Sequence, residues 1–283
     1  MSGFSADWLA LREPHDTCAR NPAVLNAVVA SQAGNTSIRI VDLACGTGST
    51  LRALAPRFST GQNWRLTDND LSLLARASAT TRPQGVSVTA VPLDLNLDLE
   101  AALDGPIDLV TTSALLDLVS AAWLDRLAIE TVARSIPIYA ALSYDGRIEI
   151  SPPHTYDETI IAAVNAHQRG DKGFGPALGP MAASAAIARF ESLGYSIVHG
   201  PADWVIGPYD REFQMEILAG WASAAREFGS MSLADMVGWL TCRRDDVAAG
   251  RSAIRVGHVD IFARPTGTRR AVRSQSNNIS SSS

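Results

Sequence analysis

The sequence has few cysteines, and their spacing excludes a disulfide framework or a zinc site. Cys18, Cys45 and Cys242 are odd in number and far apart, without the short paired spacings that zinc and redox sites use. His15 and Asp16 lie close to Cys18, but no further ligand follows at a useful spacing. We therefore expect no bound metal and a reducing compartment, the cytoplasm.

Positive charge and long apolar runs are also scarce. The formal net charge is −5, from 24 Lys and Arg against 29 Asp and Glu, so no basic surface is expected and nucleic acid is disfavoured as a partner. No apolar run approaches the ~20 residues of a membrane-spanning helix. Charges interrupt the N-terminal MSGFSADWLALREPHD before a signal sequence develops. We expect neither secretion nor a membrane partner.

What the sequence does contain is an alternation of strand and helix patterns that begins near Ile38. Short β-branched runs followed by helical spacings are typical of repeated β-α units and a parallel sheet. The pattern predicts an α/β fold, a Rossmann-like, seven-stranded, mostly parallel sheet with helices on both faces. The expected strands are 37–43, 64–66, 86–92, 107–112, 136–142, 195–206 and 254–262, with helical insertions after strands five and six.

Several local signals refine this outline. Asp145-Gly146 is a strong turn dipeptide, so a hairpin-like extension from strand five to Ile150 is expected. Thr155-x-x-Glu158 has the pattern of a capping box that opens a helix. A long amphipathic stripe then predicts a helix ended by Gly229, either core or a dimer face, or else one wall of a substrate pocket. Its members are Phe213, Ile217, Trp221, Ala224 and Phe228.

The segment IRIVDLACGTGST carries the clearest chemical signal. An apolar strand ends at Asp42, and the chain then turns through Gly46 and Gly48 into a helix. Glycine lets a ligand approach the backbone, and the free N–H groups at the start of the helix can bind a carboxylate or phosphate. Asp68 follows about twenty residues later at the end of the second strand, where a carboxylate can accept hydrogen bonds from ribose hydroxyls. Asp94 ends the third strand. Three polar strand ends on one sheet edge predict a nucleoside-binding crevice.

These residues also resemble a known family. VDLACGTGS resembles motif I of the class I S-adenosylmethionine-dependent methyltransferases, TDND the acidic end of their second strand, and PLDLN their adenine-contacting turn. The N-terminal WLALREPHD is similar to bacterial members in which a helix covers the cofactor. The resemblance implies S-adenosylmethionine as cofactor and methyl transfer as activity.

The resemblance also implies roles for particular residues. Asp42, Gly46 and Gly48 would line the methionine end of the cofactor. Asp68 would bind the ribose, and Asp94 with Leu95 the adenine. Ala44 and Asn69 would be further cofactor-binding residues. Ser113, after the fourth strand, would lie near the sulfonium. The corresponding domain division is a helical cap at 1–36, a methyltransferase domain at 37–265 with insertions at about 151–181 and 208–250, and a disordered tail at 266–283.

Other nucleotide-binding folds fit less well. A nicotinamide dinucleotide fold needs a third glycine where this chain has Leu51, and no Gly-Lys-Ser/Thr follows the turn as in a P-loop. Two further alternatives stay open. One is a cofactor-binding regulatory protein without turnover, and the other is an enzyme that uses S-adenosylmethionine for decarboxylation, cyclisation or hydrolysis.

The acceptor is expected to be a small molecule, bound beneath a lid formed by the segment 144–180. This insertion gathers ionisable residues around flexible glycines, although a solvated surface loop would have the same composition. His154, His167 and Arg169 are the candidates for catalysis, with either histidine able to act as a base. Asp117 could orient the acceptor or be a solvated helix-start residue. A homodimer is a further possibility.

Overall fold

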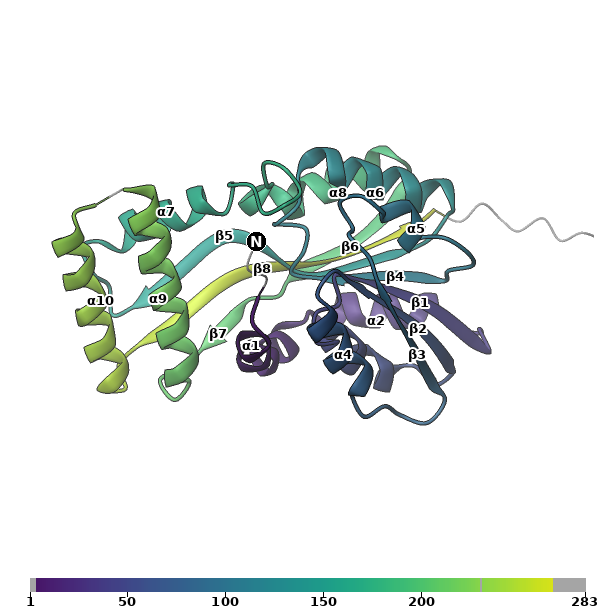
Figure 1. Cartoon of the computed structure of the whole chain (residues 1–283), viewed down its shortest axis with the longest axis horizontal. Helices are drawn as coiled ribbons and strands as arrows, with labels where there is room; N and C mark the ends of the chain where they lie inside the picture. The colour runs from purple at the N-terminus through teal and green to yellow at the C-terminus, as the bar shows by residue number, and fades with distance from the viewer. Residues whose placement is uncertain (1–3, 230, 267–283) are drawn as a thin grey trace, which may run out of the picture.

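The computed structural model describes residues 4–229 and 231–266, so the expected disordered tail lies, apart from Thr266, outside the described residues. The sheet has the order β3-β2-β1-β4-β5-β8-β6, with β7 paired to β8 (Figure 1). β1 to β5 are parallel, and β8 is antiparallel to its neighbours. The strands are β1 (Ser37–Leu43), β2 (Gly61–Asp68), β3 (Val86–Pro92), β4 (Leu109–Ser113), β5 (Ile138–Ser151), β6 (Tyr195–Pro201), β7 (Trp204–Ile206) and β8 (Ala253–Pro265). The predicted α/β fold is confirmed.

Helices cover both faces of the sheet, as Figure 1 shows. One apolar core unites β1, β4 and β5 with α5 (Leu99–Ala102), α6 (Ala121–Ala133) and α8 (Ala182–Ser192). On the opposite face, a second core holds α2 (Pro22–Ser31), α3 (Ser49–Leu54) and α4 (Leu71–Ala79). Every central strand is thus buried on both sides, which is why these strands read as continuous apolar runs.

β5 and β8 continue past this three-layer part into a helical lobe on the left of Figure 1. There β7, α7 (Asp157–His167), α9 (Arg211–Phe228) and α10 (Leu233–Ala248) enclose a third apolar core. The N-terminal helix α1 (Ala6–Ala19) lies between the two parts and contacts β7. Among the described residues, no helix combines the length and apolar character that a membrane crossing requires.

The hairpin expected at Asp145-Gly146 is wrong, because β5 is one strand from Ile138 to Ser151. Its pairing with β8 jumps from Tyr144↔His258 to Ile148↔Val256, so extra residues bulge out of β5 rather than reversing it. Gly146 adopts φ +89°, and Asp145 accepts a hydrogen bond from the backbone N–H of Arg147 at 3.0 Å. The dipeptide has turn geometry, but the long partner strand β8 keeps both sides of the bulge in one sheet.

Two other local expectations are also corrected. α7 begins after Tyr156, and its first turn has no side-chain cap. The carboxylate that binds a backbone N–H at this end is that of Asp157, rather than the hydroxyl of Thr155, and it accepts from His154 N at 2.7 Å. The single strand expected over 195–206 is divided into β6 and β7, which pair with different stretches of β8.

The amphipathic stripe on α9 is core, as one of the interpretations held. Phe213, Ile217, Trp221 and Ala224 are buried in the lobe, whereas Phe228 is 56% exposed. None of the five lines the large cleft described below.

Candidate functional site

A cleft of about 1110 Å³ opens where the C-terminal ends of β1 to β4 meet α1 and the loop after α7. Ends of parallel strands are the usual ligand-binding edge of an open α/β sheet. Of the nine residues predicted to bind a cofactor, the structure brings seven together on its wall: Ala44, Gly46, Asp68, Asn69, Asp94, Leu95 and Ser113. Asp42 and Gly48 do not line it.

The glycine turn after β1 is a strained segment closed against α1. Ala44 and Gly46 have φ of 50° and 53°, a left-handed conformation that favours glycine. A Cβ built on Gly46 would lie 3.2 Å from Cδ1 of Leu9 in α1, so this glycine keeps open the space between the turn and the helix. Gly48 has a different role, since its Cβ would lie 3.3 Å from that of Ala77 in α4.

Asp42 supports the turn from below. It is fully buried, and Oδ1 accepts a hydrogen bond from the hydroxyl of Thr111 at 2.7 Å. Oδ2 makes no hydrogen bond within the part of the chain that the structure describes, and burial raises the pKa of this carboxyl to about 7. The sequence correctly placed Asp42 at the strand end, but the structure does not place it on the cleft wall.

Asp68 joins the second strand to the glycine turn. One carboxylate oxygen accepts from Gly46 N at 2.8 Å and the other from Asp70 N at 3.0 Å. Burial raises the pKa of Asp68, and these backbone donors oppose the shift. An ionised carboxylate has roughly four acceptor positions, so Asp68 retains capacity for ligand hydroxyls on the cleft side.

The third and fourth strand ends complete this wall. Asp94 is exposed and accepts a hydrogen bond from Asn96 N at 2.9 Å. The carbonyl of Leu95 accepts from the indole N–H of Trp123 at 2.7 Å, which fixes the turn after β3. After β4, the hydroxyl of Ser113 accepts from Arg20 Nη2 at 3.4 Å. Arg20 is buried at the end of α1, so this contact fastens the N-terminal helix to the sheet edge.

Of the three predicted catalytic residues, the structure brings only His167 to the cleft. Its Nε2 lies 3.3 Å from a carboxylate oxygen of Glu227. His154 lies just before the first turn of α7 and His167 on its last residue. A helix of this length, rising about 1.5 Å per residue, separates them by more than a hydrogen bond can reach. Arg169 is exposed and lies outside the lining.

Six charged lining residues were missed as site residues: Arg12, Asp16, Asp70, Asp171, Lys172 and Glu227. Arg12 and Asp16 of α1 form an ion pair at 2.9 Å that is buried against the cleft, yet in sequence they look like an ordinary surface pair four residues apart. Lys172 also lines the cleft. A signal for it was available, since it is the only lysine among the 24 basic residues of the chain.

Asp117 is buried directly behind the cleft rather than solvated. Its backbone carbonyl accepts from Gly179 N at 3.0 Å, which ties the segment after β4 to the end of the loop after α7. Burial raises the pKa of the Asp117 carboxyl to about 6, and its Oδ1 makes no hydrogen bond to any described residue. Within the described residues, no three His, Cys, Asp or Glu side chains gather as a metal site would require.

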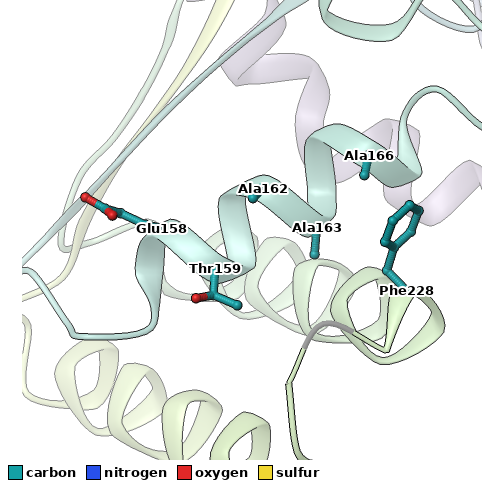
Figure 2. Close-up of a pocket in the computed structure, with 6 residues that line it drawn as sticks. All are labelled: Glu158, Thr159, Ala162, Ala163, Ala166 and Phe228. Atoms are coloured by element: carbon teal, nitrogen blue, oxygen red, sulfur yellow. The ribbon is translucent and has the colours of Figure 1, made fainter.

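A second hollow, of about 440 Å³, lies on the lobe between α7 and the end of α9. Figure 2 shows the small side chains of α7 facing Phe228 across it. Glu158 is the only ionisable residue in its lining, which otherwise consists of Thr159, Ala162, Ala163, Ala166 and Phe228. The hollow therefore lacks the convergent polar groups of a reaction site.

Comparison with known proteins agrees with this geometry. Residues 40–135 match the family model described as a methyltransferase domain. The cyclopropane-fatty-acyl-phospholipid synthase-like protein of Lactobacillus casei has a similar structure, with a TM-score of 0.53 and 12% identity over 92% of this chain and 94% of that one. A SAM-dependent methyltransferase from Geobacter sulfurreducens, in complex with S-adenosyl-L-homocysteine, matches with a TM-score of 0.46 and 17% identity, covering 93% and 100% of the two chains. Among curated proteins no match is found.

Proposed function

We propose that the chain, whose residues 40–135 match the family model of a methyltransferase domain, binds S-adenosylmethionine in the cleft after β1 to β4 and transfers the methyl group to a small-molecule acceptor. The observation that carries this proposal is the convergence of seven cofactor-type residues on one cavity. They come from four separate strand ends.

The residues present fit this cofactor. Gly46 leaves open the approach to the turn, which a larger residue would fill toward Leu9. Asp68 is held by two backbone donors and can still accept hydrogen bonds from two ribose hydroxyls. Leu93 and Leu95 offer apolar contact for an adenine ring, and Asp94 beside them offers an acceptor for its amino group.

The sulfonium of the bound cofactor supplies an activated methyl group whose leaving thioether is neutral. The protein then has to align the acceptor and exclude water. Phe4, just before α1, and Leu9 of α1 are apolar residues of the lining, and Leu9 lies against the glycine turn, which suits water exclusion. His167 is the one imidazole in the described lining, and we propose that it accepts a proton from an acceptor that must lose one.

The size of the cleft supports a small acceptor. Pockets for a single drug-sized ligand measure about 300–1,000 Å³, so a cleft of about 1110 Å³ has room for the cofactor and a small molecule. The net charge of −5 gives no general attraction for nucleic acid.

Two measurements test the proposal. Calorimetry with S-adenosylmethionine, S-adenosylhomocysteine and NAD should give tight binding of the first two only. Incubation with methyl-labelled S-adenosylmethionine and a cell lysate should then place the label in the small-molecule fraction. Tighter binding of NAD contradicts the cofactor assignment, and label in protein or nucleic acid contradicts the acceptor class. Binding without any labelled product would instead identify a regulatory protein.

A further inference from the structure

Arg12 is an arginine fixed in place on the cleft wall. It is 8% exposed, and its Nε and Nη2 donate to the two oxygens of Asp16 at 2.9 and 3.2 Å. Asp16 is held in turn by the indole N–H of Trp204 at 2.9 Å. The guanidinium also lies 5.0 Å from the centre of the Trp204 ring. The side chain therefore has little freedom left to lose when a ligand binds.

One nitrogen of Arg12 remains available. Nη1 makes no hydrogen bond within the described residues. Unlike Nε of Arg20, it is not among the atoms that lack a hydrogen bond and are also buried from solvent. Because Arg12 lines the cleft, a ligand there can reach this donor. An arginine with one face on an indole and one edge on a carboxylate presents its last nitrogen in a fixed direction.

The neighbours of Arg12 place it away from the cofactor turn. Trp204 and His258, whose rings lie 4.6 Å apart, belong to β7 and β8 at the entrance to the lobe. Glu13, the next residue along α1, points in a different direction. It pairs with Arg52 beside the glycine turn. Arg12 lines the cleft and Glu13 does not. Arg12 also lies close enough to Asp117, which follows β4, to attract its ionised form.

The cleft lining contains a second cation, Lys172. It donates to the carbonyl of His167 at 3.1 Å, and no ion pair joins it to a carboxylate within the described residues. The nearby carboxylates are already engaged, since Glu227 pairs with His167 and Asp171 accepts from the backbone N–H groups of Gly173 and Gly175. The same lining includes the apolar Leu115, Leu118 and Phe174, so an apolar body with an anionic oxygen group matches it.

We infer that Arg12 Nη1 anchors a carboxylate of the methyl acceptor, with Lys172 as the second cation, so that the acceptor is a small carboxylic acid with an apolar body. This inference rests on the proposed function. The cofactor also has a carboxylate that Arg12 could bind in place of the carboxylate of the acceptor. The experiment below distinguishes these two ligands.

The test begins with a titration of the protein with S-adenosylhomocysteine. If this ligand does not bind, the proposed function itself is wrong, and not only the assignment of Arg12. Protein saturated with S-adenosylhomocysteine is then titrated with benzoate and with its uncharged match, benzamide, by NMR chemical shifts. We expect benzoate to bind about 10- to 100-fold more tightly, the range for a hydrogen bond that involves a charged group. Equal affinities would overturn the inference.

Arg12→Met should remove the preference for benzoate while changing S-adenosylhomocysteine affinity less than about twofold. Because this variant leaves Asp16 without its ion pair, the double variant Arg12→Met, Asp16→Asn is measured beside it and should behave in the same way. Arg39→Met is the matched control. Arg39 of β1 donates from its Nε and Nη2 to the two oxygens of Asp108, both at 2.8 Å, and it lies outside the cleft lining. It should keep the full preference.

A final arm identifies the source of the carboxylate. Methylthioadenosine lacks the amino acid part of the cofactor. If Arg12→Met weakens S-adenosylhomocysteine binding tenfold or more and leaves methylthioadenosine binding unchanged, Arg12 holds the cofactor and the acceptor assignment is overturned. Retention of the benzoate preference by both Arg12 variants would overturn it equally.

Discussion

The carboxylate of Asp68 and the backbone N–H of Gly46 are joined by a hydrogen bond of 2.8 Å. The end of β2 and the turn after β1 therefore form one unit, reinforced by a hydrogen bond from Cys45 N to the carbonyl of Thr67 at 2.9 Å. The glycine turn therefore orients the carboxylate of Asp68 before a ligand binds. In the proposed site, the ribose of the ligand would bind Asp68 and its amino acid end would lie on the turn. The two halves of the proposed cofactor site are thus coupled through protein contacts.

This coupling predicts that Asp68→Ala affects more than the ribose. We expect S-adenosylhomocysteine binding to weaken by about 1.5 to 3 kcal/mol for the lost charged hydrogen bonds, with a further loss as Gly46 N is left unpaired. Asp68→Glu should be milder because it keeps the charge. Calorimetry gives both values, and an unchanged dissociation constant for the alanine variant would remove Asp68 from the site.

Gly46→Val should abolish S-adenosylhomocysteine binding. The new side chain would start 3.2 Å from Leu9 Cδ1 and would require a branched residue at φ +53°. Gly34→Val is the matched control, since Gly34 also has positive φ, at +89°, but meets nothing within 4 Å and lies at the opposite end of β1. It should lose stability and keep its affinity. Normal binding by Gly46→Val would show that the turn is not the site.

The sequence predicted the elements that depend on local pattern. β1 and β3 have the expected limits, and Gly194 and Gly229 end their helices as expected. Burial on both faces produces long apolar runs, and these can be read without knowing the neighbours. Asp42 was found for the same reason, because it ends such a run. Asp68 and Asp94 were found from their positions at the ends of the next two predicted strands, although β2 alternates with polar residues and β3 has no buried residue.

What the sequence could not give depends on partners far along the chain. The bulge at Asp145 is decided by pairing with β8, more than a hundred residues later. The fixed orientation of Arg12 depends on Trp204, 188 residues after Asp16. His154 and Arg169 were grouped with His167 by proximity in sequence. Helix α7 separates His154 from His167, and Arg169, two residues after His167, lies outside the cleft lining.

Glu13 and Arg52 predict how α1 is held over the cleft. Arg52 donates to both oxygens of Glu13 and also to the carbonyl of Thr47 in the turn. Glu13→Gln should raise hydrogen exchange in α1 and weaken S-adenosylhomocysteine binding by less than about 1 kcal/mol, as a partly exposed pair contributes little. Glu130→Gln, which removes the surface pair with Arg134 on α6, is the control. Identical exchange in α1 for wild type and Glu13→Gln would mean that other contacts hold the helix.

The last prediction concerns Asp117, whose pKa is raised to about 6 by burial from an ordinary value of 3.8. Because the folded protein keeps this proton to higher pH than the unfolded chain does, the carboxyl contributes stability below about pH 4, and this contribution is lost as the pH rises through about 6. Asp117→Asn lacks the titration. Its free energy of unfolding, relative to wild type, should therefore increase by about 2 to 3 kcal/mol between pH 4 and pH 7 and then stay level.

Urea unfolding of both proteins at pH 4, 5, 6, 7 and 8 measures this difference, and taking the difference cancels the other titrating groups that the two proteins share. Asp104→Asn, at an exposed position, is the control for the removal of one surface carboxyl. If the Asp117→Asn difference does not change with pH, burial does not raise the pKa of the carboxyl behind the cleft. A difference that falls with rising pH would mean that Arg12, which attracts the ionised form, outweighs the effect of burial.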